Sequence, residues 1–552
     1  MFRQLGFRFA DKNMRKSRVV QVDMNVTVRA DSGASWYASR GTEADAFERA
    51  PLTYDLDVDA CVIGGGLAGL TAAREIARRG WSVAVLEAGR VAWSASGRNS
   101  GFVLPGFGTD PRAMVERVGV DRARELWGLS EGGVEYVRAA IRDFAMPGVD
   151  PVDGWLDVSK VDNGDEMLAV ASLLGQDFGA TIEGWPTEQV RAALRSDFYF
   201  HAIHYPTAFH IDPLAYSRGL ARATLAAGAV IFEETPALSI DPTGVRKRIA
   251  TPTGRVRAAH IVLAGNVHLA PLVPGLADTV LPVTGYVAVT APLGERLAAA
   301  IAWRGAVSDT RLANHHYRIV GGDRLMWAGA GGLRPGGPRD AAQQFQGAIA
   351  RIFPQLGAVE FEHAWSGVMG FSLHSMPQVG EVIPGLWLAN GFGAHGLNTT
   401  AMAGELIAAA ITEQDDRWRL FLPYELVWAG GRLGRLVRHV GMWSLGRSED
   451  WAASMARRRE AVRRAEAPGG PVQAAAEPAS SPAAGHAEAA AHGRHVPPAD
   501  AVEVDVPEVE SLLRKAAERA KETHADERGW PHERGAPAEE ENPPFGRNSR
   551  DS

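Results

Sequence analysis

Three glycines and one glutamate of this sequence have the residue types and the spacing that can hold a dinucleotide. Gly64, Gly66 and Gly69 directly follow a short apolar run, and Glu87 comes ~20 residues further along the chain. Gly64 permits a tight turn, Gly66 has no side chain to block a pyrophosphate, and Gly69 allows a helix to pack closely on a sheet. The carboxylate of Glu87 can accept hydrogen bonds from a ribose diol but would repel a 2′-phosphate. The pattern therefore predicts a dinucleotide site and disfavours NADP.

The elements that must position these residues form a βαβ unit. The apolar run 58–63 predicts a buried parallel strand, 70–79 predicts a helix that ends at Gly80, and 81–86 predicts a second strand that leads into Glu87. The helix N-terminus presents free N–H groups and a partial positive charge to a diphosphate. Because strand, loop, helix and acid occur in this order, a glycine turn without a ligand is the weaker interpretation.

Two further segments have residues suited to the same ligand. The loop from Arg90 to Phe102 is small and polar, and its hydroxyls, amides and Arg98 can meet a diphosphate or a flavin edge, although its composition also fits a plain surface loop. The glycines of 391–398 let the backbone approach a flat ligand closely. A helix predicted over 399–411 would start beside Leu397 and Asn398, where its N-terminus suits negative charge on a reduced flavin.

The run from Val62 to Glu87, followed by Ser96-Gly97-Arg98-Asn99, resembles the D-amino-acid oxidase/glycine oxidase superfamily of FAD enzymes. The resemblance is closest to its gamma-glutamylputrescine oxidase-like branch and covers about residues 35–455 in collinear order. The other segments that carry it are Ser35-Trp36-Tyr37-Ala38-Ser39, Ile211-Asp212-Pro213-Leu214, Gly228-Ala229-Val230-Ile231, Ile261–Asn266, Trp365-Ser366-Gly367, Pro377-Gln378-Val379-Gly380 and Gly391–Asn398.

The resemblance implies an α/β fold in which a Rossmann-like FAD-binding domain is interleaved with an α+β substrate domain on a mixed or antiparallel sheet. We expect residues 55–155, 196–275 and 365–415 in the FAD-binding domain and 156–195 and 276–364 in the substrate domain. The residues expected to contact FAD are Gly64, Gly66, Leu67, Ala68, Gly69, Glu87, Ala88, Arg90, Ser96, Gly97, Arg98, Asn99, Ser100, Gly101, Ala237, Gly265, Gly393, His395, Gly396, Leu397 and Asn398.

The cofactor is expected to bind without a covalent bond. Family members that tether FAD use a cysteine near the closing motif or a histidine near the first loop. The single cysteine, Cys61, lies on the first strand, where a small buried hydrophobe is expected, and the loop 94–101 has no histidine. With one cysteine, neither an intrachain disulfide nor a multi-cysteine metal site is possible, and we expect no metal.

The family implies oxidation of a C–N bond of an amine or amino acid, with hydride transfer to flavin N5 and hydrolysis of the resulting imine. Candidate catalytic residues are Tyr286, Tyr317, Arg318 and His395. Arg318 can anchor a substrate carboxylate, or it can point outward into solvent. His395 can tune the flavin or only satisfy a backbone carbonyl. A predicted hairpin over 314–329 places His316 and Arg318 on one face and His315 and Tyr317 on the other.

Ordinary core packing is the second interpretation for the aromatic side chains of this region, and it is favoured for Tyr286, Tyr317, His315 and Trp365. Oxygen or an electron carrier can reoxidise the flavin, so the class includes both oxidases and dehydrogenases. A non-catalytic flavin-binding subunit is the alternative from a different class.

Composition bounds the remaining classes. The chain has 552 residues with a net charge of −7, which argues against a nucleic-acid surface. No apolar run approaches the ~20 residues that a membrane span needs, and no secretory signal is apparent, so a cytoplasmic location is expected. We predict an irregular arm over 1–50, a helical segment over 416–460 and a disordered tail over 467–552. Within that tail, 506–522 has helical spacing and is either a transient helix or a docking helix for a partner.

Overall fold

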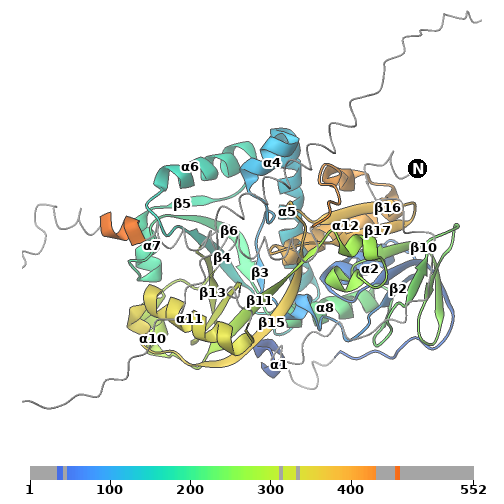
Figure 1. Cartoon of the computed structure of the whole chain (residues 1–552), viewed down its shortest axis with the longest axis horizontal. Helices are drawn as coiled ribbons and strands as arrows, with labels where there is room; N and C mark the ends of the chain where they lie inside the picture. The colour runs from blue at the N-terminus through green and yellow to red at the C-terminus, as the bar shows by residue number, and fades with distance from the viewer. Residues whose placement is uncertain (1–33, 41–46, 310–314, 331–335, 430–453, 460–552) are drawn as a thin grey trace, which may run out of the picture. The chain divides into compact units, whose positions relative to one another are not determined.

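The computed structural model describes residues 34–40, 47–309, 315–330, 336–429 and 454–459, which all belong to one compact unit spanning 1–472. Within it lie two β-sheets, the first on the right of Figure 1 and the second on the left. The predicted tail over 467–552, with its helix over 506–522, lies outside the described residues.

The first sheet is built around parallel strands. Its strands, in spatial order, are β16 (Gln378–Ile383), β17 (Leu386–Asn390), β10 (Arg255–Leu263), β1 (Leu56–Ile63), β2 (Val83–Leu86) and β7 (Val230–Phe232), with β8 (Ser239–Asp241) and β9 (Lys247–Ala250) as a side hairpin on β10. The strands from β17 to β7 are parallel, and β16 is antiparallel to β17.

Apolar layers cover both faces of this sheet, which is why its strands are continuous apolar runs. On one face Val62 packs with helix α2 (Leu67–Arg78), and on the other Cys61 packs with β10 side chains. Helix α12 (Gly396–Glu413) lies beside α2 (Figure 1), and it approaches closely because Gly404 has no side chain. A Cβ at Gly404 would lie 2.6 Å from Thr71 Cβ. Helices α5 (Val120–Asp143) and α8 (Pro213–Ala226) complete this layer.

The second sheet is mixed. Its strands, in spatial order, are β15 (Phe361–Phe371), β11 (Leu281–Thr290), β14 (Arg324–Ala330), β13 (His316–Val320), β12 (Ala306–Ser308), β4 (Val152–Val158), β6 (Ala202–His210) and β3 (Phe102–Val103), with β5 (Glu183–Trp185) paired to β6. The pair β12–β4 is parallel and the other pairs are antiparallel. The predicted α/β fold with a second, mixed sheet is confirmed.

The two faces of the second sheet have different neighbours, and this decides which side chains can reach a cofactor. One face packs under α11 (Pro338–Ile352), α10 (Glu295–Ala300) and α7 (Thr187–Leu194), which form one apolar cluster with it. The other face packs into the cluster that contains α2, α5 and α12. We call these the outer face and the cofactor-side face of the second sheet.

Three expectations about boundaries meet a different arrangement. Strand β6 pairs with both β3 and β4, so β3 and β6 belong to the second sheet, although 55–155 and 196–275 were expected in the FAD-binding domain. The arm over 1–50 is not irregular throughout, because α1 (Trp36–Arg40) is a helix with Tyr37 buried. Within 416–460 the described residues contain a short 3₁₀ helix over Arg417–Phe421 and a helical turn over 454–459. The remaining α-helices that the structure describes are α3 (Ala95–Arg98), α4 (Pro111–Val118), α6 (Gly164–Ser172) and α9 (Pro274–Ala277), and short helices of other types span Leu173–Asp177, Asn266–Leu269 and Pro354–Leu356.

Candidate active site

The site lies at the carboxyl edge of the first sheet, where β1, β2, β10 and β17 end together. These strands lead into Gly64, Glu87, Ala264 and Gly391. Ligands of open parallel sheets bind outside this edge, because the loops there and the helix N-termini face the same space.

Two glycines of the first loop, Gly64 and Gly69, lie where an added Cβ would overlap backbone atoms. Gly64 has φ +116°, and a Cβ there would lie 2.6 Å from the carbonyl oxygen of Ala264. The backbone that follows β10 is therefore a second reason for a glycine at position 64. A Cβ at Gly69 would overlap the carbonyl oxygen of Gly64, which explains the close approach of α2 to β1. A Cβ at Gly66 would meet only the hydroxyl of Ser96, at 2.8 Å.

Glu87 is buried and held by three N–H groups. Its Oε2 accepts from the backbone N–H of Gly65 (2.7 Å), and its Oε1 accepts from Gly89 N–H (2.8 Å) and the indole of Trp93 (2.8 Å). Burial raises the pKa of Glu87, and these three donors act in the opposite direction. The carboxyl group is therefore fixed at the end of β2, where a ribose was expected. The sequence pattern did not identify its three donors.

Arg90, expected to contact FAD, has charged partners of its own. Its guanidinium is 3.3 Å from the fully buried carboxylate of Glu233 and 3.1 Å from Glu234. Glu233 also accepts from the N–H groups of Arg49 and Val91. In this structure Arg90 thus belongs to a structural cluster.

The segment from Ser96 to Gly101 connects the first sheet to the second. It includes most of the one-turn helix α3, and we call the whole segment a loop. Ser96 Oγ accepts from Leu67 N–H at the N-terminus of α2 (3.0 Å). The amide of Asn99 donates to the carbonyls of Ala95 (3.1 Å) and Ser96 (2.8 Å), and its Oδ1 accepts from Gly101 N–H (2.8 Å). These contacts fold the loop into one conformation instead of the plain surface loop that its composition allowed.

The closing segment is anchored on β15 and ends in a helix N-terminus. Gly393 (φ +60°) donates its N–H to the carbonyl of Gly370 (2.9 Å). The N–H groups of Gly396, Leu397 and Asn398 open α12, where an α-helix has no partners for them. The side-chain Oδ1 of Asn398 is buried and has no hydrogen-bond partner among the described residues. The N–H groups fit a ligand that carries negative charge at this end of the site, whereas the acceptor Oδ1 of Asn398 fits a ligand N–H or O–H.

His395 is the N-cap residue of α12. Its Nδ1 is buried and has no partner in the described part of the chain, and the backbone of Leu104 lies close to the ring. Burial lowers the pKa of His395 to about 4, and it therefore stays neutral near pH 7.

His316 lies near His395, and the sequence did not single it out. It is on the cofactor-side face, with ring centroids 5.7 Å from Phe102 and 6.0 Å from Trp155. Its Nδ1 is also buried and has no partner in the described ranges. The pKa of His316 is lowered to about 3, mainly by burial and also by the nearby imidazoles of His315 and His395. The alternation along β13, which puts it on the face of Arg318, was the available signal.

The two tyrosines that are candidate catalytic residues, Tyr286 and Tyr317, lie on the outer face of the second sheet. Tyr317 stacks on Trp327 (4.6 Å between centroids), and Tyr286 donates its hydroxyl to the carbonyl of Gly336 (3.0 Å). Both belong to the apolar cluster under α11. Their burial there agrees with ordinary core packing, the interpretation favoured for both side chains, because helices cover the face that carries them.

Arg318 is on the cofactor-side face but is buried and engaged, so neither a solvent-facing arginine nor a free substrate anchor describes it. Its guanidinium contacts His210 Nδ1 (2.7 Å) and donates to the hydroxyl of Tyr37 (3.1 Å) and the carbonyl of Ile211 (2.8 Å). The arginine therefore joins segments of the protein together.

The remaining residues expected at the cofactor lie in the same loops or beside them. Leu67 and Ala68 form the buried first turn of α2, and Gly97 packs against the carbonyl of Ala92. Ala88 is exposed after β2, and Ser100 is half-buried. Gly265 follows β10, and Ala237 follows β7 and packs on the apolar cluster of that strand.

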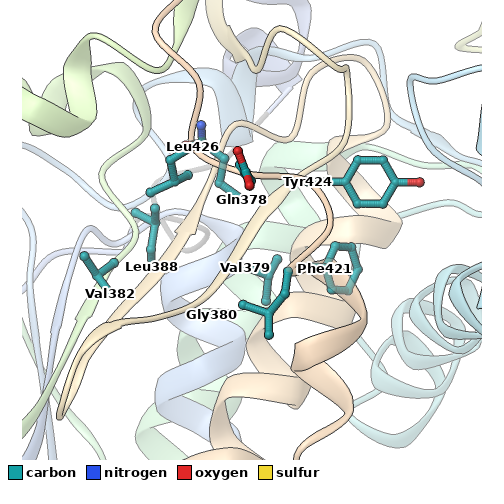
Figure 2. Close-up of a pocket in the computed structure, with 10 residues that line it drawn as sticks. Gln378, Val379, Gly380, Val382, Leu388, Phe421, Tyr424 and Leu426 are labelled. Atoms are coloured by element: carbon teal, nitrogen blue, oxygen red, sulfur yellow. The ribbon is translucent and has the colours of Figure 1, made fainter. Parts of the chain in front are cut away.

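A separate pocket on β16 is too small for these ligands (Figure 2). Gln378, Val379 and Gly380 of β16 line it together with Phe421 and Tyr424, and its cavity volume is only about 20 Å³. That space suits about one water molecule.

The residues present fit non-covalent FAD. Two helix N-termini, a glycine loop and the buried Glu87 share one sheet edge, and the only cysteine of the sequence, Cys61, is fully buried inside β1. Among the described side chains, no group of three or more His, Cys, Asp or Glu can hold a metal ion. Likewise, none of the helices in the described ranges is both long and apolar enough to cross a membrane.

Comparison with known proteins agrees with this class of site, that of a dinucleotide-binding flavoprotein. The model of the family "FAD dependent oxidoreductase" matches residues 59–410, and the chain therefore belongs to this family. It is an FAD-dependent enzyme, which confirms the predicted cofactor and the family resemblance.

Three relatives indicate how far the similarity extends. The chain is 28% identical to the probable oxidoreductase OrdL of Haemophilus influenzae over 72% of this chain and 93% of the relative. It is 29% identical to gamma-glutamylputrescine oxidoreductase of Escherichia coli over 73% and 95%, respectively. Its fold is similar to that of glycine oxidase from Bacillus cereus, with a TM-score of 0.55 and 20% identity over 66% of this chain and 97% of that structure.

Proposed function

We propose that this protein oxidises a C–N bond of a small amine or amino acid, in the manner of gamma-glutamylputrescine oxidases. When bound, FAD supplies the acceptor for a hydride from the carbon next to nitrogen, and water hydrolyses the resulting imine. The similarity to gamma-glutamylputrescine oxidoreductase supports an amine substrate.

The observation that carries the proposal is the pair of buried imidazoles, His316 and His395, whose Nδ1 atoms have no partner among the described residues. Loss of hydride leaves positive charge on the substrate, so a protonated imidazole beside it would oppose the reaction. Both rings have strongly lowered pKa values and are therefore uncharged near pH 7. We assign His395 Nδ1 as an acceptor for an N–H of the neutral amine, with His316 beside it as the second polar contact.

The aromatic neighbours of His316 support a small, mostly apolar pocket. Phe102 and Trp155 meet edge to face at 4.8 Å, and both contact the imidazole. Such a wall, with a few polar groups that fix orientation, is usual for a small-molecule site.

The test is anaerobic mixing of the FAD-loaded protein with gamma-glutamylputrescine, a D-amino acid and an N-methyl amino acid, followed by admission of air. Bleaching of the flavin absorbance by at least one of them is expected, and His316→Ala should slow it at least tenfold without changing FAD content. His201→Ala is the matched control, because the His201 ring pairs with Asp162 (3.2 Å) and not with the residues of this site. A protein that no amine bleaches would contradict the proposal and favour a non-catalytic flavin-binding subunit.

The second arm of this experiment separates two enzyme classes. Rapid recolouring by air supports an oxidase, and slow recolouring that an added electron carrier accelerates supports a dehydrogenase. A cytoplasmic location and a partner for the tail stay predictions.

A further inference from the structure

The short helix α1, which precedes β1, contacts the loop from Ser96 to Gly101 through the side chain of Tyr37. Tyr37 of α1 is 3% exposed, and its ring meets that of Trp365 edge to face at 5.4 Å. Its hydroxyl donates to the carbonyl of Asn99 (2.9 Å) and accepts from the guanidinium of Arg318 (3.1 Å). A residue far from the glycine loop in sequence is therefore bonded to the loop that follows Glu87.

The neighbouring carbonyl of the same loop is held in a similar way. Trp365 of β15 donates its indole N–H to the carbonyl of Arg98 (2.8 Å), and Arg98 Nε donates to the carbonyl of Ser366 (2.8 Å). Two consecutive carbonyls, those of Arg98 and Asn99, thus turn toward a pair of aromatic side chains that also contact each other.

The contacts of Tyr37 form part of a closed circuit. Arg318 donates to the carbonyl of Ile211 (2.8 Å), and Ile211 in turn donates its N–H to the carbonyl of Gly101 (2.8 Å). The circuit therefore runs from Asn99 through Tyr37, Arg318 and Ile211 back to Gly101. It joins the loop to α1, to β13 and to the start of α8.

The chemistry of the hydroxyl suits this fixed role. Burial raises the pKa of Tyr37 to about 12, so the proton stays on the oxygen. The single proton serves the carbonyl of Asn99, because the thioether of Met326 (3.4 Å) is a weaker acceptor. Removing the oxygen would leave one buried carbonyl and one guanidinium N–H without this partner, which is costly inside a protein.

On the opposite side, the same loop touches the glycine motif. Ser96 Oγ accepts from Leu67 N–H at the N-terminus of α2. Any shift of the loop would therefore be passed on to the N-terminus of α2, which would hold the diphosphate of bound FAD.

We propose that Tyr37 is a positioning residue of the FAD site: its hydroxyl holds the loop from Ser96 to Gly101 in the conformation that FAD binding requires. The helix α1 is then part of the cofactor site and not an appendage before it. The proposal rests on FAD binding alone and is independent of the amine that the enzyme oxidises.

The experiment compares Tyr37→Phe with Tyr54→Phe. The first variant keeps the buried ring and removes only the oxygen, while Tyr54 is 54% exposed and provides the same chemical change on the surface. We expect the Kd for FAD of Tyr37→Phe to rise about tenfold, which corresponds to about 1.4 kcal/mol. We also expect a shift in the visible absorption spectrum of the bound flavin, with both Kd and spectrum unchanged in Tyr54→Phe.

A second variant guards against a folding artefact. Trp365→Phe removes the donor to the adjacent carbonyl, so it should weaken FAD binding and shift the flavin spectrum in the same direction. Thermal unfolding of each apoprotein is measured in parallel. Wild-type FAD affinity and spectrum in Tyr37→Phe would overturn the proposal, as would a lowered apoprotein midpoint in that variant without any change in the bound-flavin spectrum of either variant.

Discussion

Gly69→Ala is the sharpest test of how the first loop is built. The added Cβ would overlap the carbonyl oxygen of Gly64, far inside the 3.0 Å that such contacts keep, and it would also lie 3.1 Å from Val62 Cγ1. Backbone cannot turn aside as a flexible side chain can, so α2 must move away from β1. Overpacking of this kind costs about 1–3 kcal/mol, and the clash with backbone favours the upper end.

The better helix propensity of alanine offsets part of that cost, by about 1 kcal/mol. The expected net loss for Gly69→Ala is therefore about 1–2 kcal/mol in the free energy of unfolding. Gly128→Ala on α5 is the matched control: nothing lies within 4 Å of its Cβ, so it should gain about 0.5–1 kcal/mol.

The measurement is urea unfolding of the two apoproteins, followed by titration with FAD. The two variants should differ by about 2 kcal/mol, and only Gly69→Ala should bind FAD more weakly. If Gly69→Ala were as stable as Gly128→Ala, the close approach of α2 to β1 would not be the reason for a glycine at position 69.

Two other predictions follow from buried charged or titratable groups. The pKa values of His210 and His316 are lowered to about 3 and that of His395 to about 4, so below pH ~6.5 the unfolded chain binds more protons than the folded one and stability falls as the pH drops. Urea unfolding at pH 5.5 should show a loss on the order of 1 kcal/mol for each of these rings relative to pH 7.5, and therefore a smaller loss in His316→Asn. Equal stability at both pH values would contradict the burial of these rings. Arg318→Lys keeps the charge but loses the forked contacts to Tyr37 and its neighbours, so apoprotein stability should fall by about 2 kcal/mol; unchanged stability with a raised KM for an amino acid would instead restore a substrate-anchoring role.

The glycine loop and its flanking elements could be predicted because their signals are local. The strand ending at Ile63, the helix ending at Arg78 and the strand ending at Leu86 lie within a few residues of their predicted bounds. Each depends on an apolar run, a glycine or a helix end that is adjacent in sequence. The predicted helix beside Leu397 and Asn398 begins at Gly396 for the same reason.

The facing of the second sheet could not be predicted in this way. Alternation correctly separates His316 and Arg318 from Tyr317 on β13, but it does not tell which face meets the cofactor. That choice depends on α11, which covers the outer face with Phe345 and Ile349 and comes later in the chain. The proximity of His316 to His395 likewise depends on two segments that meet only in the folded protein.

The order of strands in the first sheet has a consequence for folding during synthesis on the ribosome. The register places Leu56 opposite Val256 in β10, and Ile261 of β10 opposite Leu386 in β17. One edge of β1 pairs with the nearby β2, but the other edge pairs with β10, which is synthesised much later, and such distant pairings form slowly because a long loop must close first. The nascent glycine loop has no α12 beside it until the chain has passed Glu413. We therefore expect the complete cofactor site to form late in folding, so that the early βαβ segment stays exposed to aggregation while the rest of the chain emerges.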